Sequence, residues 1–150
     1  MKKITICFFL FLFNSCHSFA ENITPNISLD PEKIIRIQLN ALKNNDQNDS
    51  GIQKTWLFAH PKNKLATGPY DRFKKMLYDP HYVILLNHYS HHLSLIDSSE
   101  REKIYEIKIT TKDQRHFFYE WKVEIGSEEN CKSCWFTSAV SFPQLKGKNI

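Results

Sequence analysis

The strongest hydrophobic pattern in the chain covers residues 116–125, where every second position is apolar. The apolar residues at these positions are Phe117, Tyr119, Trp121, Val123 and Ile125. This two-residue alternation of aromatic and β-branched side chains is typical of a strand with one buried face. Burying five such side chains is worth roughly 1.5–3 kcal/mol each, which together rivals the net stability of a whole domain. We therefore predict that this strand lies at the centre of the core.

Other strands are predicted on both sides of it. Residues 103–111 alternate cleanly, with Tyr105, Ile107 and Ile109 on one side. Weaker patterns predict strands over 89–96, where histidines interrupt the pattern, and over 134–142. The polar turns between these segments are short, so an antiparallel meander is expected. The apolar run 82–86 marks the point where the period changes from helix to strand.

Three helices are predicted before the strands. Asp30-Pro31-Glu32 combines a capping side chain, a first-turn proline and an acid near the positive helix end. Apolar positions at helical spacing continue for about twelve residues after it. Asp49-Ser50-Gly51 opens a second helix that Pro61 ends, residues 61–67 are predicted to be a basic and polar loop, and residues 70–77 form a third helix. Helices followed by a meander predict an α+β fold, with N-terminal helices packed on a curved antiparallel sheet.

The first 20 residues have the pattern of a secretory signal peptide. They contain two lysines, an apolar run over 4–13 and the end Ser18-Phe19-Ala20. The run is too short for a stable membrane anchor, so we expect a protein that is exported to a periplasm or secreted and has no membrane span. A lipoprotein attached through Cys16 is the less favoured alternative. Residues 21–29 are predicted to be a disordered leader, 30–142 a single domain and 143–150 a solvated tail.

Charge excludes one class of partner. The formal net charge of the chain is +4, and removal of Lys2 and Lys3 with the signal peptide lowers it to +2. Because positive and negative residues are interspersed without a basic stripe, nucleic acid is not expected to be a partner.

Six segments between residues 30 and 140 carry a resemblance to a known group of proteins. They are QLNALKNND (38–46), Gly51-Ile52, FAHPKNKLATGPYDRF (58–73), Leu85-Leu86-Asn87-His88, Tyr119-Glu120-Trp121 and CWFTSAV (134–140). With the helix-then-strand layout, the chain resembles an uncharacterised bacterial and plant family of the nuclear transport factor 2-like superfamily, which implies a cone of helices against a bent sheet. The family has no assigned activity, so the resemblance carries over no functional residues. The superfamily includes isomerases, dehydratases, hydrolases and binding modules, so fold does not decide function.

The cysteine pair Cys131-Lys132-Ser133-Cys134 has the spacing of a redox or metal motif. A thioredoxin-type site needs the pair at a helix N-terminus, whereas this pair precedes a strand. A zinc site needs two further ligands. A turn at Lys132-Ser133 would bring the two cysteines within bonding reach, and we predict a local disulfide there in an oxidising compartment.

The histidines His81, His88, His91 and His92 form the other cluster that metal chemistry uses. On a continuous strand His88 and His92 would share one face, with His91 on the other. A metal site is one hypothesis, but structural or solvated histidines are favoured, and neither a metal nor a cofactor is expected. His88 is the best single candidate for a polar group at the mouth of the cone.

Aromatic residues are the main candidates for a ligand pocket. Tyr105, Tyr119, Trp121 and Trp135 either line such a pocket or fill the core. Acidic candidates are weaker, because alternation turns Glu120 away from the helices and Asp71 begins a helix, where an acid is usually structural. No nucleophile arrangement, phosphate loop or dinucleotide motif is present, so no catalytic residue is assigned.

Three functions remain open. The preferred one is a non-enzymatic module that binds a small apolar ligand or a protein, which predicts a pocket without a buried titratable pair. An isomerase or hydrolase predicts a buried acid or histidine within reach of a second polar group. A structural module predicts a homodimer through an apolar patch of Phe118 and Phe136 on the outer face of the sheet.

Overall fold

The computed structural model describes residues 23–126 and 131–145 of the chain. The predicted signal peptide and residues 146–150 of the predicted tail lie outside the described residues. Four helices precede the strands: α1 (Pro31–Lys43), α2 (Ser50–Leu57), α3 (Pro61–Thr67) and α4 (Tyr70–Leu77). A 3-10 helix, η1 (Val83–Leu85), leads into β1 (Ser90–Ser98), β2 (Glu102–Thr110), β3 (His116–Ile125) and β4 (Trp135–Val140).

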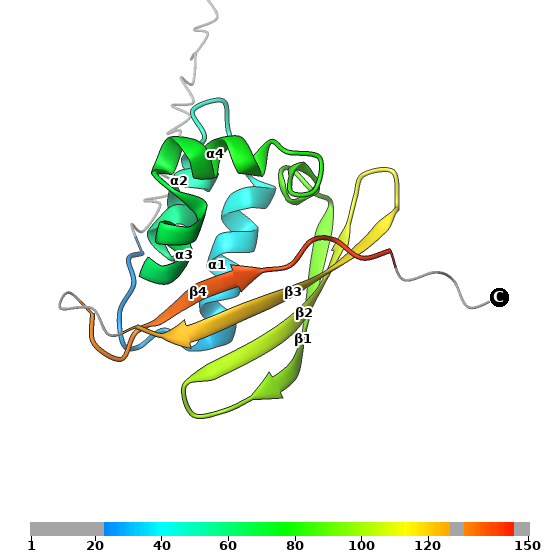
Figure 1. Cartoon of the computed structure of the whole chain (residues 1–150). Coiled ribbons are helices and arrows are strands. Elements are labelled where there is room, and N and C mark those ends of the chain that lie inside the picture. The colour runs from blue at the N-terminus through cyan, green and yellow to red at the C-terminus, as the bar shows by residue number, and fades with distance from the viewer. Residues whose placement is uncertain (1–22, 127–130, 146–150) are drawn as a thin grey trace, which may run out of the picture.

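The strands form one open antiparallel sheet in the order β1-β2-β3-β4. Figure 1 shows α1 crossing the sheet, with α2, α3 and α4 gathered beside it, while the β1–β2 hairpin bends along its length. The α+β class and the antiparallel sheet are therefore confirmed.

The central position of the aromatic strand is also confirmed. Ile107 on β2 faces Tyr119 on β3, and Tyr105 faces Trp121. All four side chains are buried, and Trp121 is only 1% exposed. Because the inward side chains of the two strands lie opposite each other, they form one continuous apolar face beneath the helices.

The first helix begins as its sequence predicts. The Asp30 carboxylate accepts a hydrogen bond from the backbone N–H of Lys33 at 2.7 Å, and Pro31 occupies the first turn. The buried face of α1 consists of Ile34, Ile35, Gln38, Leu39 and Leu42. Four of these five positions are apolar, so α1 packs on the sheet through an aliphatic stripe that one amide side chain interrupts.

Two segments differ from the sequence-based expectation. Residues 61–67 form the helix α3 and not a loop, because Pro61 occupies the first position of this helix; α2 already ends at Leu57. His60 caps it by accepting the N–H of Lys62 on Nδ1 at 3.1 Å. Residues 83–85 form a 3-10 helix, whose Leu85 is buried in the core, instead of the start of a strand.

The described parts of the predicted leader and tail are both attached to the domain. Leu29 is 5% exposed and packs with Ile34 and Phe58 in a small apolar cluster that Ile23 also contacts. At the other end, Gln144 and Phe118 exchange two backbone hydrogen bonds of 2.8 and 3.0 Å. Within residues 23–126 and 131–145, no helix has the length and apolar character that crossing a bilayer requires.

Candidate functional site

A cavity of about 80 Å³ lies between the helices and the sheet. Its walls come from α1, α2, α3, α4, η1, β3, β4 and the residues next to them. The lining side chains are mostly apolar, and the apolar ones are Leu42, Ala59, Phe73, Met76, Leu77, Leu85, Trp121 and Val140. The cavity is therefore small and mainly apolar.

Four residues of the cavity wall are joined in one hydrogen-bonded chain. Trp121 Nε1 donates to Thr137 Oγ1 at 2.9 Å, and this hydroxyl donates to Gln38 Oε1 at 2.5 Å. Gln38 Nε2 in turn donates to the carbonyl oxygen of Thr55 at 2.9 Å. The side chains of this chain are at most 5% exposed. We call these four residues the Gln38–Thr137 network. It links α1 and α2 to β3 and β4, and each of the four residues has a hydrogen-bond partner within it.

The cavity wall offers little acid–base chemistry. Among its described lining residues no aspartate, glutamate, histidine, lysine, arginine or cysteine occurs. Its only titratable group is Tyr82, whose hydroxyl donates to the carbonyl oxygen of Val140 at 3.1 Å. Burial raises the pKa of Tyr82 above its usual value of 10. A tyrosine in this state holds its proton at neutral pH and is a hydrogen-bond donor, not a base.

Of the aromatic candidates, Trp121 lines the cavity and the others lie elsewhere. Tyr119 is buried in the core and donates its hydroxyl proton to the His81 carbonyl oxygen at 2.8 Å; burial raises its pKa. Tyr105 lines a shallow surface depression near the start of α1, and Trp135 packs between the main core and the cluster around Phe58. Glu120 is exposed, as its phase predicts.

His88 does not line the cavity. It is 4% exposed, and its Nδ1 lies 2.7 Å from the Leu85 carbonyl oxygen. Because that oxygen only accepts, Nδ1 carries the proton, and His88 Nε2 accepts from Nδ1 of His91 at 2.7 Å. Burial lowers the pKa of both rings, and that of His91 falls to about 4, with the neighbouring His88 as a further cause. The expectation that His88 and His92 share one face of a strand is wrong: β1 begins only at Ser90, and His88 is buried before the strand whereas His92 is exposed on it.

The apolar patch expected on the outer face of the sheet is also wrong for Phe136. This residue faces Glu124 on β3, which is an outward position, yet it is 4% exposed. Residues 58–60 run parallel beside Thr137 and carry His60 across the Phe136 ring, with centroids 6.2 Å apart. Gly126 closes the other side, since a Cβ there would lie 2.7 Å from the ring. Phe118 remains half-buried.

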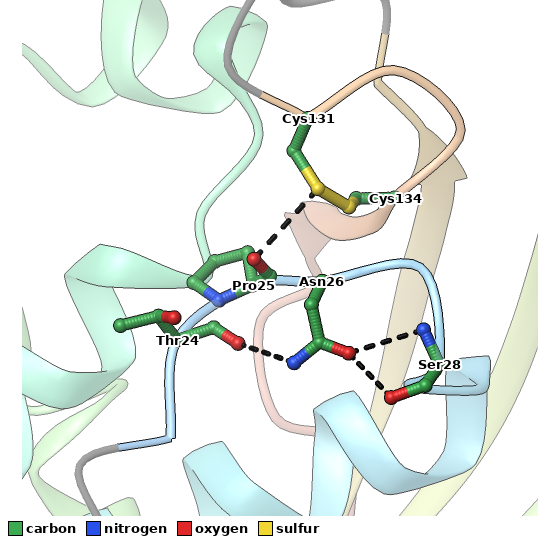
Figure 2. The surroundings of a disulfide bond; sticks show 6 residues. All are labelled: Thr24, Pro25, Asn26, Ser28, Cys131 and Cys134. Carbon is green, nitrogen blue, oxygen red and sulfur yellow. Dashed lines mark hydrogen bonds between the residues drawn. A yellow bond between two sulfur atoms is a disulfide. The ribbon is translucent and has the colours of Figure 1, made fainter.

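Cys131 and Cys134 are joined in a disulfide at the start of β4. Their Cα atoms are 5.5 Å apart, and the turn between them places Ser133 at a positive φ of 68°. Figure 2 shows the leader passing beside this bond, where the Cys131 sulfur lies 3.7 Å from the carbonyl oxygen of Pro25. Closing so short a loop stabilises the fold by roughly 2 kcal/mol.

A second titratable cluster lies outside the cavity, at the start of α2. The Asp49 carboxylate is 2.5 Å from Lys74 Nζ, accepts the Tyr78 hydroxyl at 2.5 Å and also accepts from Asn45 at 3.1 Å. These contacts, first that to Lys74, lower the pKa of Asp49 to about 2. Because both oxygens of this carboxylate accept from neighbours in the protein, we interpret the cluster as a structural link between α2 and α4. No group of three possible metal ligands occurs within the described residues.

Gln38, Thr137 and Thr55 are absent from the candidates that the sequence supplies. A weak signal for them exists: Gln38 lies on the apolar stripe of α1, and Thr137 has the inward phase of β4. A polar residue at an inward position must find a partner, so the two could have been predicted to meet. Asn63 and Thr67 were missed because their helix was predicted to be a loop.

Comparison of the chain with protein-family models, with curated proteins and with solved structures finds no match. The site is therefore interpreted from its own geometry.

Proposed function

We propose that the protein is an exported, non-enzymatic binding module of the nuclear transport factor 2-like type, which takes a small apolar ligand into the cavity between its helices and sheet. The observation that carries this proposal is the composition of the cavity wall. It is mostly apolar, its described lining residues include no acid, histidine or lysine, and its polar side chains already have hydrogen-bond partners within the protein.

The chemistry of the wall favours binding over catalysis. General acid–base catalysis needs a titratable group within hydrogen-bond reach of the substrate. The wall supplies only Tyr82, whose pKa is raised by burial. A ligand that brought its own polar groups would find those of the Gln38–Thr137 network occupied, so the wall selects against polar ligands.

The size of the cavity limits the ligand to a few heavy atoms. A dry cavity of about 150 Å³ holds benzene, and the cavity here measures about 80 Å³. Met76 and Leu77 both lie on its wall. Methionine is unbranched and adapts readily to a neighbouring group, so movement of Met76 would provide the additional room.

Thermal unfolding with and without benzene tests the proposal. A ligand that binds the native state raises the midpoint with concentration, and we expect this for the unaltered protein. Thr67→Leu fills the cavity from its rim and should abolish the shift. Ala66→Leu is the matched control, because Ala66 is an exposed neighbour on α3 that does not line the cavity.

Two results would contradict the proposal. One is an unfolding midpoint that benzene leaves unchanged in the unaltered protein. The other is a shift that persists in full in Thr67→Leu, since the ligand would then bind elsewhere. Leu77→Ala provides a further check: it should lower stability by about 2–5 kcal/mol but increase the shift that benzene causes, because the cavity becomes larger.

A further inference from the structure

A second concave surface lies on the outside of the helical layer, away from the cavity. It is a groove of about 910 Å³ along α1 and α2, and it shares no lining residue with the cavity. Gly51 lets the two helices approach closely, because a Cβ at this position would collide with the carbonyl oxygen of Ala41. The groove is therefore held between two helices in direct backbone contact. We call it the α1–α2 groove.

The wall of this groove includes apolar side chains that are only partly covered. Ile37 of α1 and Trp56 of α2 are half-buried, and Leu57 is 39% exposed. Ile23, from the segment before α1, also lines the groove. Apolar surface that the fold leaves partly open at a concave site is typical of binding sites.

The charged side chains of the groove are both lysines. The Lys54 ammonium group donates to the carbonyl oxygen of Ile23 at 3.0 Å, and the Lys64 ammonium group lies 5.5 Å from the centre of the Trp56 ring. Among the described residues that line the groove no aspartate or glutamate occurs. Two cations thus lie beside apolar surface, and each is held by a contact with the groove wall.

The helices around the groove also carry an excess of positive charge. Residues 50–78 contain six basic residues and one acid, Asp71, although the net charge of the whole chain is only +4. The basic residues are Lys54, Lys62, Lys64, Arg72, Lys74 and Lys75. This segment carries a charge of +5, and two of its cations, Lys62 and Lys74, are paired with Glu124 and Asp49 outside it. The remaining charge of +3 attracts anions to the surface that contains the groove.

We propose that the α1–α2 groove binds a long-chain anionic amphiphile, with its acyl chain against Ile37, Trp56 and Leu57 and its acidic head at Lys54 and Lys64. The volume of the groove lies within the range of small-molecule sites, about 300–1,000 Å³. An apolar wall with two lysines among its lining residues matches an acyl chain that ends in a carboxylate or phosphate. This site is independent of the cavity and of the function proposed for it.

Titration calorimetry with sodium laurate, below its micelle concentration, tests the proposal. We expect laurate to bind, and decanoate to bind roughly tenfold more weakly, since each buried methylene contributes about 0.8 kcal/mol. Dodecyltrimethylammonium, which has the same chain and the opposite charge, should not bind. Vesicles with and without phosphatidylglycerol form a second arm, in which co-sedimentation shows whether the acidic head can belong to a bilayer.

The variants localise the effect. Lys54→Gln and Lys64→Gln should each weaken laurate about two- to fivefold, as for partly exposed ion pairs, and Ile37→Ser should weaken it further. Lys108→Gln is the matched control, because Lys108 lies on the outer face of the sheet opposite Phe118 and should leave binding unchanged. Binding of laurate alone identifies a free acid as the ligand, and binding of anionic vesicles as well extends it to a lipid head.

Three results would overturn the proposal. The first is that neither laurate nor anionic vesicles bind. The second is that the cationic amphiphile binds as tightly as laurate, which would remove the role of the lysines. The third is that the three groove variants bind laurate as the unaltered protein does, because the amphiphile would then be held at another surface.

Discussion

Replacement of Thr137 by valine is the sharpest test of how the helices are joined to the sheet. Valine has nearly the same shape as threonine, so the change removes one hydroxyl and leaves the packing in place. That hydroxyl is the acceptor for Trp121 Nε1 and the donor to Gln38 Oε1. Without it, a donor on β3 and an acceptor on α1 lose their partner in a region where the side chains are at most 2% exposed.

The expected cost follows from the two orphaned groups. A buried polar group that loses its partner costs about 1–3 kcal/mol, so Thr137→Val should lower the free energy of unfolding by about 2–5 kcal/mol. For a chain of this length that corresponds to a fall of roughly 5–15 °C in the melting midpoint. Urea unfolding followed by circular dichroism and by tryptophan fluorescence measures the loss in free energy of unfolding.

A matched control and a double-mutant cycle separate the network from the substitution itself. Thr110→Val makes the same change at the end of β2, where the side chain is half-buried and faces outward, and should alter stability by less than about 0.5 kcal/mol. Gln38→Met in the Thr137→Val background should cost less than in the unaltered protein, because the acceptor it removes is already unpaired. Additive costs, or a loss below 0.5 kcal/mol for Thr137→Val alone, would refute the network as a structural tie.

Three further predictions concern charge and packing. Contact with Lys74 lowers the pKa of Asp49 from 3.8 to about 2, so this carboxylate stabilises the fold above pH 3.8 and loses the effect as pH falls towards 2. Asp49→Asn should lack this pH dependence. It should lower the free energy of unfolding at pH 7 by roughly 1–2 kcal/mol, less than the pKa shift alone implies, because Lys74 is 41% exposed and solvent screens the pair. Burial lowers the pKa of His91 from 6.5 to about 4, so the unfolded chain takes up a proton first and stability falls as pH drops from 6.5 to 4. In His91→Gln, the free energy of unfolding measured between pH 6.5 and 4 should depend less on pH than in the unaltered protein. Gly126→Ala should destabilise by about 1–3 kcal/mol in urea, because its Cβ would lie 2.7 Å from the Phe136 ring.

The strands could be predicted because their signal is local and periodic. The side chains of β2 and β3 alternate without interruption, and the inward phase of Tyr105, Ile107, Tyr119 and Trp121 matches the register of the sheet. The helix α3 was missed because a proline carries two opposite signals, an end for the preceding helix and a start for the next. The hydrogen bond from the backbone N–H of Lys62 to the His60 ring marks Pro61 as the start of a helix, and it can be seen only in the three-dimensional structure.

The candidate site was harder to predict because its residues match no motif. Trp121 was identified through its bulk and phase, but an aromatic residue in a core gives no indication whether a cavity lies beside it. His88 was placed by extending the alternation of β1 backwards beyond its first residue, Ser90. His88 lies before the strand, where its ring contacts the Leu85 carbonyl oxygen of η1 and the ring of His91 instead.

Phe136 shows that predicting the correct side of the sheet for a residue does not establish whether its side chain is exposed. Its phase on β4 places it on the outer side of the sheet, and the register with Glu124 agrees. It is nevertheless buried, because the segment before α3 adds to the edge beside β4 and brings His60 over the ring. Alternation identifies the side of a sheet, whereas coverage depends on a segment 76 positions earlier in the chain. The same segment contributes Ala59 to the cavity wall, so the contact that buries Phe136 also helps to form the proposed ligand site.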